Sequence, residues 1–230
     1  MKEYRKGNGA SLERCEQFKR LAGTNWALGC ALFPVLGKWA SSEKGVIVDY
    51  GCGESPFRDL FASARVYVRM DLERKGTGSL VVGPSSLPVR EKSVDCVLLF
   101  QVLGDIPDLG ELLREVFRAL RPGGRVIVFE TMGYPEHDLP HDYFRVMPAG
   151  LERTARLVGF HGVEVVRLGG LFTRISQLWS SYVMGRLRGW GGTRWLGVAG
   201  TVGMNVVAVA LDRALPHPSL APDYLARLEK

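Results

Sequence analysis

The sequence predicts an α/β fold in which a mostly parallel sheet carries helices on both faces. Short runs of β-branched and apolar residues, typical of strands buried on both faces, recur through the middle of the chain. They alternate with helical and turn-forming segments, as expected when crossovers join parallel strands. The first of these runs leads directly into a turn with two glycines, which is typical of a sheet edge that binds a ligand.

The composition limits the kind of protein. The chain has 230 residues, 46% hydrophobic and 23% charged, which suffices for one full core. The four cysteines lie far apart and form no Cys-x-x-Cys pair, so we expect no metal site, no disulfide framework and a cytoplasmic location. The net charge of +6 is moderate, and we expect no nucleic-acid partner.

The first strand is predicted over residues 46–48 and is followed by the glycine turn. Gly51 and Gly53 allow the backbone to turn sharply and to approach a ligand closely. Ser55 fits the N-cap of a helix, and Pro56 fits its first position. A helix that begins there would direct free N–H groups at the turn, which favours a carboxylate or a phosphate as ligand.

Asp49 indicates which ligand the turn accepts. A dinucleotide-binding turn has a third glycine where this chain has Pro56. A carboxylate at the strand end would repel a pyrophosphate, whereas it suits an ammonium or sulfonium group. Asp49 and a helix N-terminus together match the amino-acid end of S-adenosylmethionine (SAM). Asp49 and Pro56 therefore disfavour the alternative function, a nicotinamide-dependent oxidoreductase.

The following segments continue the alternation. Strands are predicted over residues 65–71, 79–82, 94–100 and 126–130. The first of these ends in Asp71, at the offset where a strand-end carboxylate accepts the hydroxyls of a ribose. A helix begins after Asp108, which forms a capping box with Glu111, and stops at the turn over residues 121–124.

Taken together, these segments resemble a class I SAM-dependent methyltransferase of the group known as type 11. The resemblance spans residues 45–168. Its motifs are the Asp-x-Gly-x-Gly turn, Asp71, the Leu87-Pro88 loop, the Val94-Asp95 strand and the Leu120-Arg121-Pro122-Gly123-Gly124 turn. It implies a Rossmann-like, mostly parallel sheet of seven strands whose last strand is antiparallel. It also implies SAM as the cofactor, bound across the carboxyl ends of the first strands.

The resemblance assigns residues to each part of SAM. The glycine turn would hold the methionine end, Asp71 the ribose, Met70 or Leu72 would flank the adenine, two serines would lie at its edge, and the end of the fourth strand would lie near the methyl group. The implied cofactor-binding residues are Asp49, Gly51, Cys52, Gly53, Met70, Asp71, Leu72, Ser85, Ser86, Phe100 and Gln101.

Two departures from the family pattern stand out. The family usually has an acid where this chain has Gly83, so the adenine amino group would depend on backbone atoms. Many relatives carry Glu-x-x-Glu-His where residues 101–105 read Gln-Val-Leu-Gly-Asp. This second departure leaves room for an altered substrate preference or for a SAM-binding protein without catalysis.

A cluster of polar residues follows the fifth strand. A hydroxyl acceptor must lose a proton during methyl transfer, which calls for a base that is active near neutral pH. His141 and His137 are the candidate bases, and Asp142 or Glu130 is expected to orient an imidazole. In the alternative interpretation, His141, Asp142 and Tyr143 only hold a loop in place.

The chain divides into four expected parts: a helical cap over residues 1–44, the SAM-binding core over 45–168, an apolar and basic helical insertion over 169–222, and a last strand over 223–230. Between Glu164 and Asp212 the chain has arginines and aromatic residues but no carboxylate. Residues 170–211 are expected to form either a lid or a peripheral membrane contact. The expected methyl acceptor is an oxygen, or in the alternative a nitrogen or carbon, of a small molecule, natural product, lipid or glycan.

Overall fold

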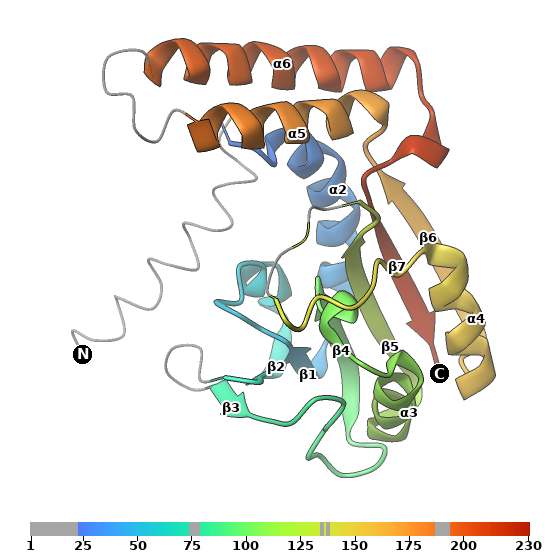
Figure 1. The fold of residues 1–230 in the computed structure, drawn as a ribbon. Helices are drawn as coiled ribbons and strands as arrows, with labels where there is room; N and C mark the ends of the chain where they lie inside the picture. Colours follow the sequence, from blue (N-terminus) through green and yellow to red (C-terminus); the bar gives the residue numbers. More distant parts are fainter. Residues whose placement is uncertain (1–22, 74–78, 134–135, 137–138, 187–193) are drawn as a thin grey trace.

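The computed structural model describes residues 23–73, 79–133, 136, 139–186 and 194–230 (Figure 1). They form a seven-stranded sheet with the order β3-β2-β1-β4-β5-β7-β6, in which only β7 runs antiparallel to its neighbours. The predicted Rossmann-like sheet and its antiparallel last strand are thereby confirmed. The strands are β1 (Gly45–Tyr50), β2 (Ala64–Asp71), β3 (Ser79–Val81), β4 (Val94–Phe100), β5 (Leu120–Thr131), β6 (Gly162–Leu168) and β7 (Asp223–Glu229).

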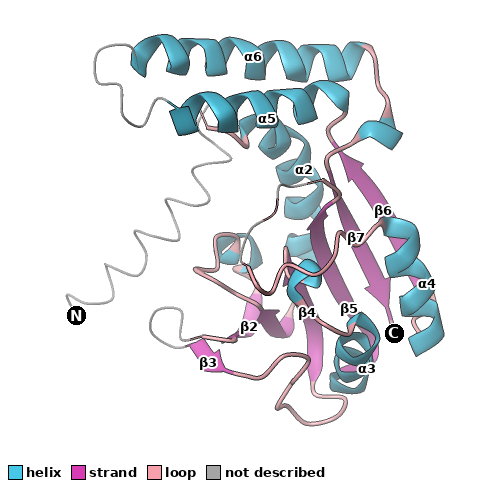
Figure 2. Cartoon of the chain, in the orientation of Figure 1, coloured by secondary structure: helices cyan, strands magenta, loops and turns pink. Residues whose placement is uncertain are grey.

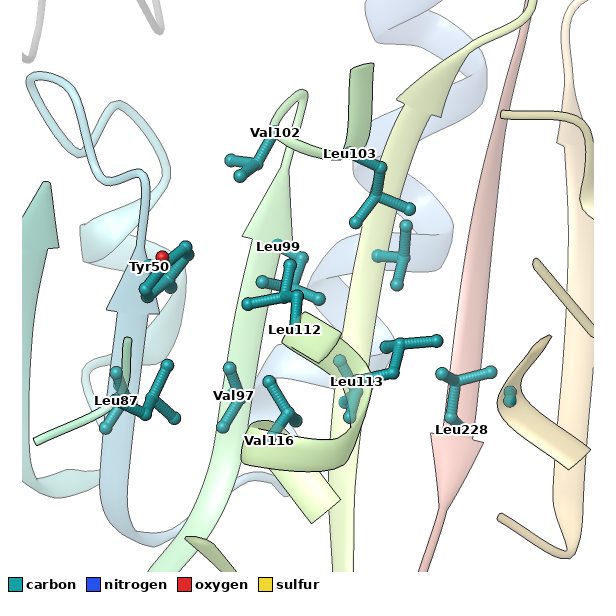
Figure 3. Close-up of a cluster of buried hydrophobic side chains, with 14 of the residues drawn as sticks. Tyr50, Leu87, Val97, Leu99, Val102, Leu103, Leu112, Leu113, Val116 and Leu228 are labelled. Atoms are coloured by element: carbon teal, nitrogen blue, oxygen red, sulfur yellow. The ribbon is translucent and has the colours of Figure 1, made fainter. Parts of the chain in front are cut away.

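Helices cover both faces of the sheet, as predicted (Figure 2). On one face, α3 (Leu109–Ala119) and α4 (Pro148–Val158) pack against alternate residues of β1, β4, β5 and β7. Figure 3 shows part of this core, where Leu99 of β4 lies against Leu112 of α3. On the other face, α2 (Trp26–Ser42) and the 3₁₀ segment η1 (Arg58–Phe61) form a second core with the remaining residues of the strands.

Asp95 explains two of the sequence motifs. Its Oδ2 accepts a hydrogen bond from the Val46 N–H at 2.7 Å, and its Oδ1 accepts one from Arg121 at 2.8 Å. A Cβ atom at Gly45 would lie 2.2 Å from the Asp95 carboxylate, so the chain needs glycine there. The Val94-Asp95 motif therefore fixes the start of β1 beside β4.

The capped helix α3 lies where the sequence predicts it. The Asp108 side chain accepts a hydrogen bond from the Glu111 N–H at 2.9 Å, which satisfies a free donor of the first turn. The fifth strand begins earlier than expected, because Leu120 already pairs with Val94 before the register shifts at the glycine turn. Gly123 has φ +74° in this irregular stretch.

One expected feature of the helices is wrong. No α-helix begins at Ser55, because this residue has φ 51° and the chain forms only the short η1 after it. The hydroxyl of Ser55 bonds to strand residues instead of capping a helix. Near the N-terminus, α2 continues through Pro34.

Two further helices lie between β6 and β7 in the sequence, as expected for an insertion before the last strand. They are α5 (Leu171–Arg186) and α6 (Arg194–Ala214), and a short 3₁₀ segment, η4 (Pro218–Leu220), leads from them to β7. We call α5 and α6 the α5–α6 hairpin. It packs on α2 through both of its helices (Figure 1). The hairpin therefore extends the molecule beyond the sheet.

Candidate functional site

The glycine turn after β1 is held at two points. Gly51 has φ +66°, and a Cβ atom there would lie 2.4 Å from the Val102 side chain. The N–H of Gly53, which has φ +47°, donates to Oδ2 of Asp71 at 2.8 Å. Because Asp71 ends β2, this bond fixes the turn to the neighbouring strand at the carboxyl edge of the sheet.

Asp49 supports this turn from below. It is buried, and its Oδ2 accepts hydrogen bonds from the hydroxyls of Ser55 at 2.7 Å and Tyr67 at 2.9 Å. Burial raises the pKa of Asp49 to about 6, although these bonds and the charge of Arg69 oppose the shift. Its predicted contact with an ammonium group stays a prediction.

Arg69 supplies the positive charge beside the turn. Its guanidinium donates to the Ser55 hydroxyl and to the Gly53 carbonyl, both at 2.8 Å. The sequence predicted a helix N-terminus here, and neither Arg69 nor Tyr67 was among the predicted site residues. The sequence contains a signal for both residues. Positions 67 and 69 are four and two residues before Asp71 on β2, so all three side chains lie on the same face of the strand.

The predicted adenine-flanking residues differ in exposure. Met70 is 1% exposed and belongs to the core, while Leu72 is 42% exposed at the strand end. Of the two, only Leu72 therefore presents a surface to a ligand. Cys52 is also buried, and burial raises the pKa of its thiol to about 11, so it supports the turn as an inert side chain.

The loop after β3 closes the other side of this edge. The Gly83 carbonyl accepts hydrogen bonds from the Tyr50 hydroxyl and from the Ser86 N–H, both at 3.1 Å. Ser85 is buried with φ 58°, whereas Ser86 is exposed. Pro84 and both serines line an open cavity of about 440 Å³ against α3. Tyr50, which the sequence argument did not single out, thus ties this loop to β1.

The end of β4 is the third part of the edge. Gln101 has φ 55° and is exposed, and its N–H donates to the Phe129 carbonyl at 2.7 Å. The Phe100 ring turns inward and packs edge-on against Phe57, with 5.4 Å between the centroids. Left-handed backbone therefore occurs after β1, β3 and β4, and such backbone is frequent at functional sites.

The segment after β5 lies over the end of β4. The N–H groups of Tyr143 and Phe144 donate to the Gly104 carbonyl at 2.9 and 3.1 Å. A Cβ atom at Gly104 would lie 2.8 Å from the Phe144 carbonyl oxygen, which explains why this chain has glycine there. On the docked segment, Nδ1 of the exposed His141 lies 3.0 Å from the Tyr143 hydroxyl.

The two acids expected to orient an imidazole have other partners. Asp142 forms a bidentate ion pair with Arg145. Glu130 is buried at the end of β5, and its two oxygens accept the N–H groups of Leu103 at 2.8 Å and Thr131 at 3.3 Å. Burial raises the pKa of Glu130 to about 7. The second candidate base, His137, lies outside the described residues.

Comparison with known proteins identifies the family. Residues 48–128 match the family model of a methyltransferase domain. Over 140 residues, the chain is 28% identical to a probable S-adenosylmethionine-dependent methyltransferase of Mycolicibacterium smegmatis. Residues 48–128 therefore carry a methyltransferase domain, on the fold of the class I SAM-dependent methyltransferases. The alignment covers 55% of this chain and 54% of the relative, so it spans about half of either protein.

A second curated relative is shorter in overlap. It is an uncharacterized 37.1 kDa protein in transposon Tn4556 of Streptomyces fradiae, 31% identical over 103 residues, or 38% of this chain and 30% of the relative. Neither relative names an acceptor.

Solved structures show the same fold. A SAM-dependent methyltransferase from Archaeoglobus fulgidus has a TM-score of 0.57 at 14% identity, covering 94% of this chain and 97% of its own. Phosphoethanolamine N-methyltransferase 2 of Haemonchus contortus, solved with SAM, has a TM-score of 0.56 at 15% identity, covering 95% and 59%. The [4+2]-cyclase SpnF has a TM-score of 0.57 at 16% identity, covering 88% and 81%. Because one of the three is a cyclase, the fold alone does not name the reaction.

The residues at this edge of the sheet fit SAM. The turn leaves no room for a Cβ atom at Gly51, Asp71 is half-buried at the tip of β2, and Leu72 presents an apolar surface beside it. Along this one edge, Asp71 suits the ribose, Leu72 suits the apolar face of the adenine ring, and the glycine turn suits the charged amino-acid end of SAM.

Proposed function

We propose that this methyltransferase moves a methyl group from SAM to a hydroxyl oxygen of a small-molecule, natural-product, lipid or glycan acceptor. The observation that carries the proposal is the pair formed by His141 and Tyr143, 3.0 Å apart, on the segment that docks over the end of β4. An imidazole is the common general base near neutral pH, and hydroxyl acceptors need one.

The chain's own residues then have distinct tasks. Asp71 accepts the ribose hydroxyls, Leu72 flanks the adenine, and the charge of Arg69 favours the carboxylate of the methionine end. SAM supplies a methyl group already activated by the sulfonium charge. His141 takes the proton of the acceptor hydroxyl as the new C–O bond forms and the C–S bond breaks. Tyr143 orients the imidazole by its hydrogen bond.

Gly104 favours an active enzyme over a SAM-binding protein without catalysis. The chain departs from the family pattern at this position, and the departure has a structural use. Gly104 admits the close approach of the Phe144 backbone and accepts two hydrogen bonds from the docked segment. Gly104 thus supports a general base that lies on the docked segment, rather than the loss of a general base.

Transfer is tested with tritium-labelled SAM, a cell extract as the source of acceptors, and extraction of the labelled product. We expect label in an organic product that resists alkali, because alkali removes methyl esters but not methyl ethers. The His141→Ala variant should lower the rate about 10²-fold or more while SAM binding, measured by calorimetry, stays unchanged.

His217→Ala is the matched control, because His217 is exposed and far along the chain in the segment before β7. It should keep the full rate. The base assignment fails if His141→Ala retains the rate of the control. The methyl-transfer proposal itself fails if the intact protein binds SAM and labels no product.

A further inference from the structure

The seam between the helices of the α5–α6 hairpin is polar. The side chains that face inward include Ser176 on α5 and Asn205 on α6, which are joined by a hydrogen bond of 2.6 Å. All of the inward polar side chains are almost completely buried, namely Thr173, Ser176, Ser180, Thr201 and Asn205. A helical hairpin that faces water on its outer side normally buries apolar side chains and exposes polar ones.

The outer surface of the hairpin is apolar. Between Trp195 and Leu211, Thr201 and Asn205 are the polar side chains, and both are buried, so α6 exposes only apolar residues and glycine over this stretch. Its segment Trp195–Ala214 has a mean hydropathy of 1.5, is long enough to cross a membrane, and is only 17% buried. The exposed large side chains of the hairpin are Ile175, Leu178, Trp179, Tyr182, Trp195, Leu196, Val206 and Val207.

The hairpin is fixed to the rest of the molecule. At its base, Asp212 accepts the N–H groups of Phe172 at 3.0 Å and Thr173 at 2.8 Å, and so caps α5 with a charge from α6. The Asn205 amide also donates to the Gly23 carbonyl at 2.9 Å, next to the start of α2. These hydrogen bonds fix the hairpin to the domain on the side that carries Asn205, and the apolar side chains of α6 face outward.

Between β6 and the end of α6, the charged residues before Asp212 are all basic. No carboxylate occurs between Glu164 and Asp212, while five arginines do. Arg186 at the end of α5 is exposed and lies over the Tyr182 ring, 5.7 Å from its centroid. Arginine and exposed tryptophan or tyrosine are the residues that settle at the boundary between headgroups and hydrocarbon.

We propose that the α5–α6 hairpin binds an anionic lipid bilayer, with α6 lying in the interface and its apolar face in the hydrocarbon boundary. A polar seam between helices and an apolar exterior are what a helical pair in lipid requires. The helices lie on the bilayer rather than span it, because both α5 and α6 are packed against α2 of the domain. This binding surface is independent of methyl transfer.

Flotation of the full-length protein with vesicles of phosphatidylcholine and phosphatidylglycerol tests the proposal. We expect the protein to float, and to stay bound at 0.5 M NaCl because apolar burial is not screened by salt. A double variant, Leu196→Gln with Val207→Gln, changes side chains that are 54% and 51% exposed on α6. It should lower the partition coefficient about tenfold or more.

The matched control is Val66→Gln with Leu157→Gln, which are 43% and 77% exposed on β2 and α4. It should partition like the unchanged protein, and circular dichroism should show the same fold for both variants. The proposal is overturned if the intact protein stays in the aqueous fraction, or if the control loses as much binding as the α6 variant. A stable dimer that depends on Leu196 and Val207 and does not bind vesicles would show that the apolar face of α6 binds a second copy of the chain instead.

Fluorescence gives a second readout, which starts from the intact protein. Lipids brominated near the headgroup should quench the exposed Trp179 and Trp195 of the intact protein, and not the buried Trp39. In the Trp179→Phe/Trp195→Phe variant most of this quenching should disappear. Equal quenching of the intact protein and this variant contradicts an interfacial α6.

Discussion

At the scale of single residues, Asp71 has a hydrogen bond to the glycine turn and a proposed contact with the ribose of SAM, and substitution can separate the two. Its Oδ2 holds the Gly53 N–H at 2.8 Å, and the carboxylate remains partly exposed for a ribose. We expect Asp71→Ala to weaken SAM binding about tenfold or more, because both interactions are lost. Asp71→Asn should bind SAM better than Asp71→Ala, because its amide oxygen still accepts from Gly53.

Calorimetry with SAM measures both variants, and Asp59→Ala is the control because Asp59 is an exposed acid of η1. Unchanged SAM affinity in Asp71→Ala would remove Asp71 from the cofactor site. The comparison with Asp71→Asn then shows whether SAM affinity depends more on the hydrogen bond to Gly53 or on the charge of the carboxylate.

At the scale of elements, Gly104 joins the end of β4 to the segment that carries His141. We expect Gly104→Ala to displace this segment, because the added Cβ would lie 2.8 Å from the Phe144 carbonyl oxygen. Overpacking of this kind costs about 1–3 kcal/mol. Amide hydrogen exchange should show lost protection at Tyr143 and Phe144, whose N–H groups bond to Gly104.

Gly150→Ala in α4 is the matched glycine control, since nothing lies within 4 Å of the added Cβ. It should leave this protection unchanged and keep or raise stability, because alanine favours helix. If Gly104→Ala keeps full protection at both amides, the docking role of Gly104 is wrong.

The elements also show what the sequence pattern can predict. Local signals sufficed for β4 and for α3, because strand composition and the Asp108 capping box act within a few residues. They failed at Ser55, which is a good N-cap by type but bonds to Asp49 and Arg69 on two strands. These partners lie 6 and 14 residues away along the chain, but on strands, so helical periodicity gives no sign of them.

The candidate site was predictable to a similar degree. The turn glycines and Asp71 lie together because parallel strands end at one edge, which the spacing of motifs already implies. The partner of Glu130 was not predictable. This acid accepts a hydrogen bond from the Leu103 N–H, a donor that only the folded chain brings near.

At the scale of the whole molecule, three buried carboxyl groups make stability depend on pH. Burial raises the pKa of Asp49 from 3.8 to about 6, of Glu130 from 4.5 to about 7 and of Asp223 from 3.8 to about 7. The folded state therefore keeps protons that the unfolded state has released. The free energy of unfolding should fall as pH rises from about 4 to about 7 through these groups.

Asp223→Asn tests this dependence, because Oδ2 of Asp223 is buried without a hydrogen-bond partner among the described residues. The variant should gain stability relative to the unchanged protein as pH rises from 4 to 8, in denaturant titrations at both values. Asp59→Asn, an exposed acid, should leave the slope unchanged. An identical slope for Asp223→Asn and the unchanged protein would mean that Asp223 is ionised in the folded state.

The position of β7 has a consequence for synthesis. β7 is paired on both sides, with β5 and with β6, and it follows the α5–α6 hairpin along the chain. β6 therefore has no neighbour in the sheet until residues 223–229 have left the ribosome. Since the hairpin emerges first, its apolar surface is available to a bilayer or a chaperone while the sheet is still open.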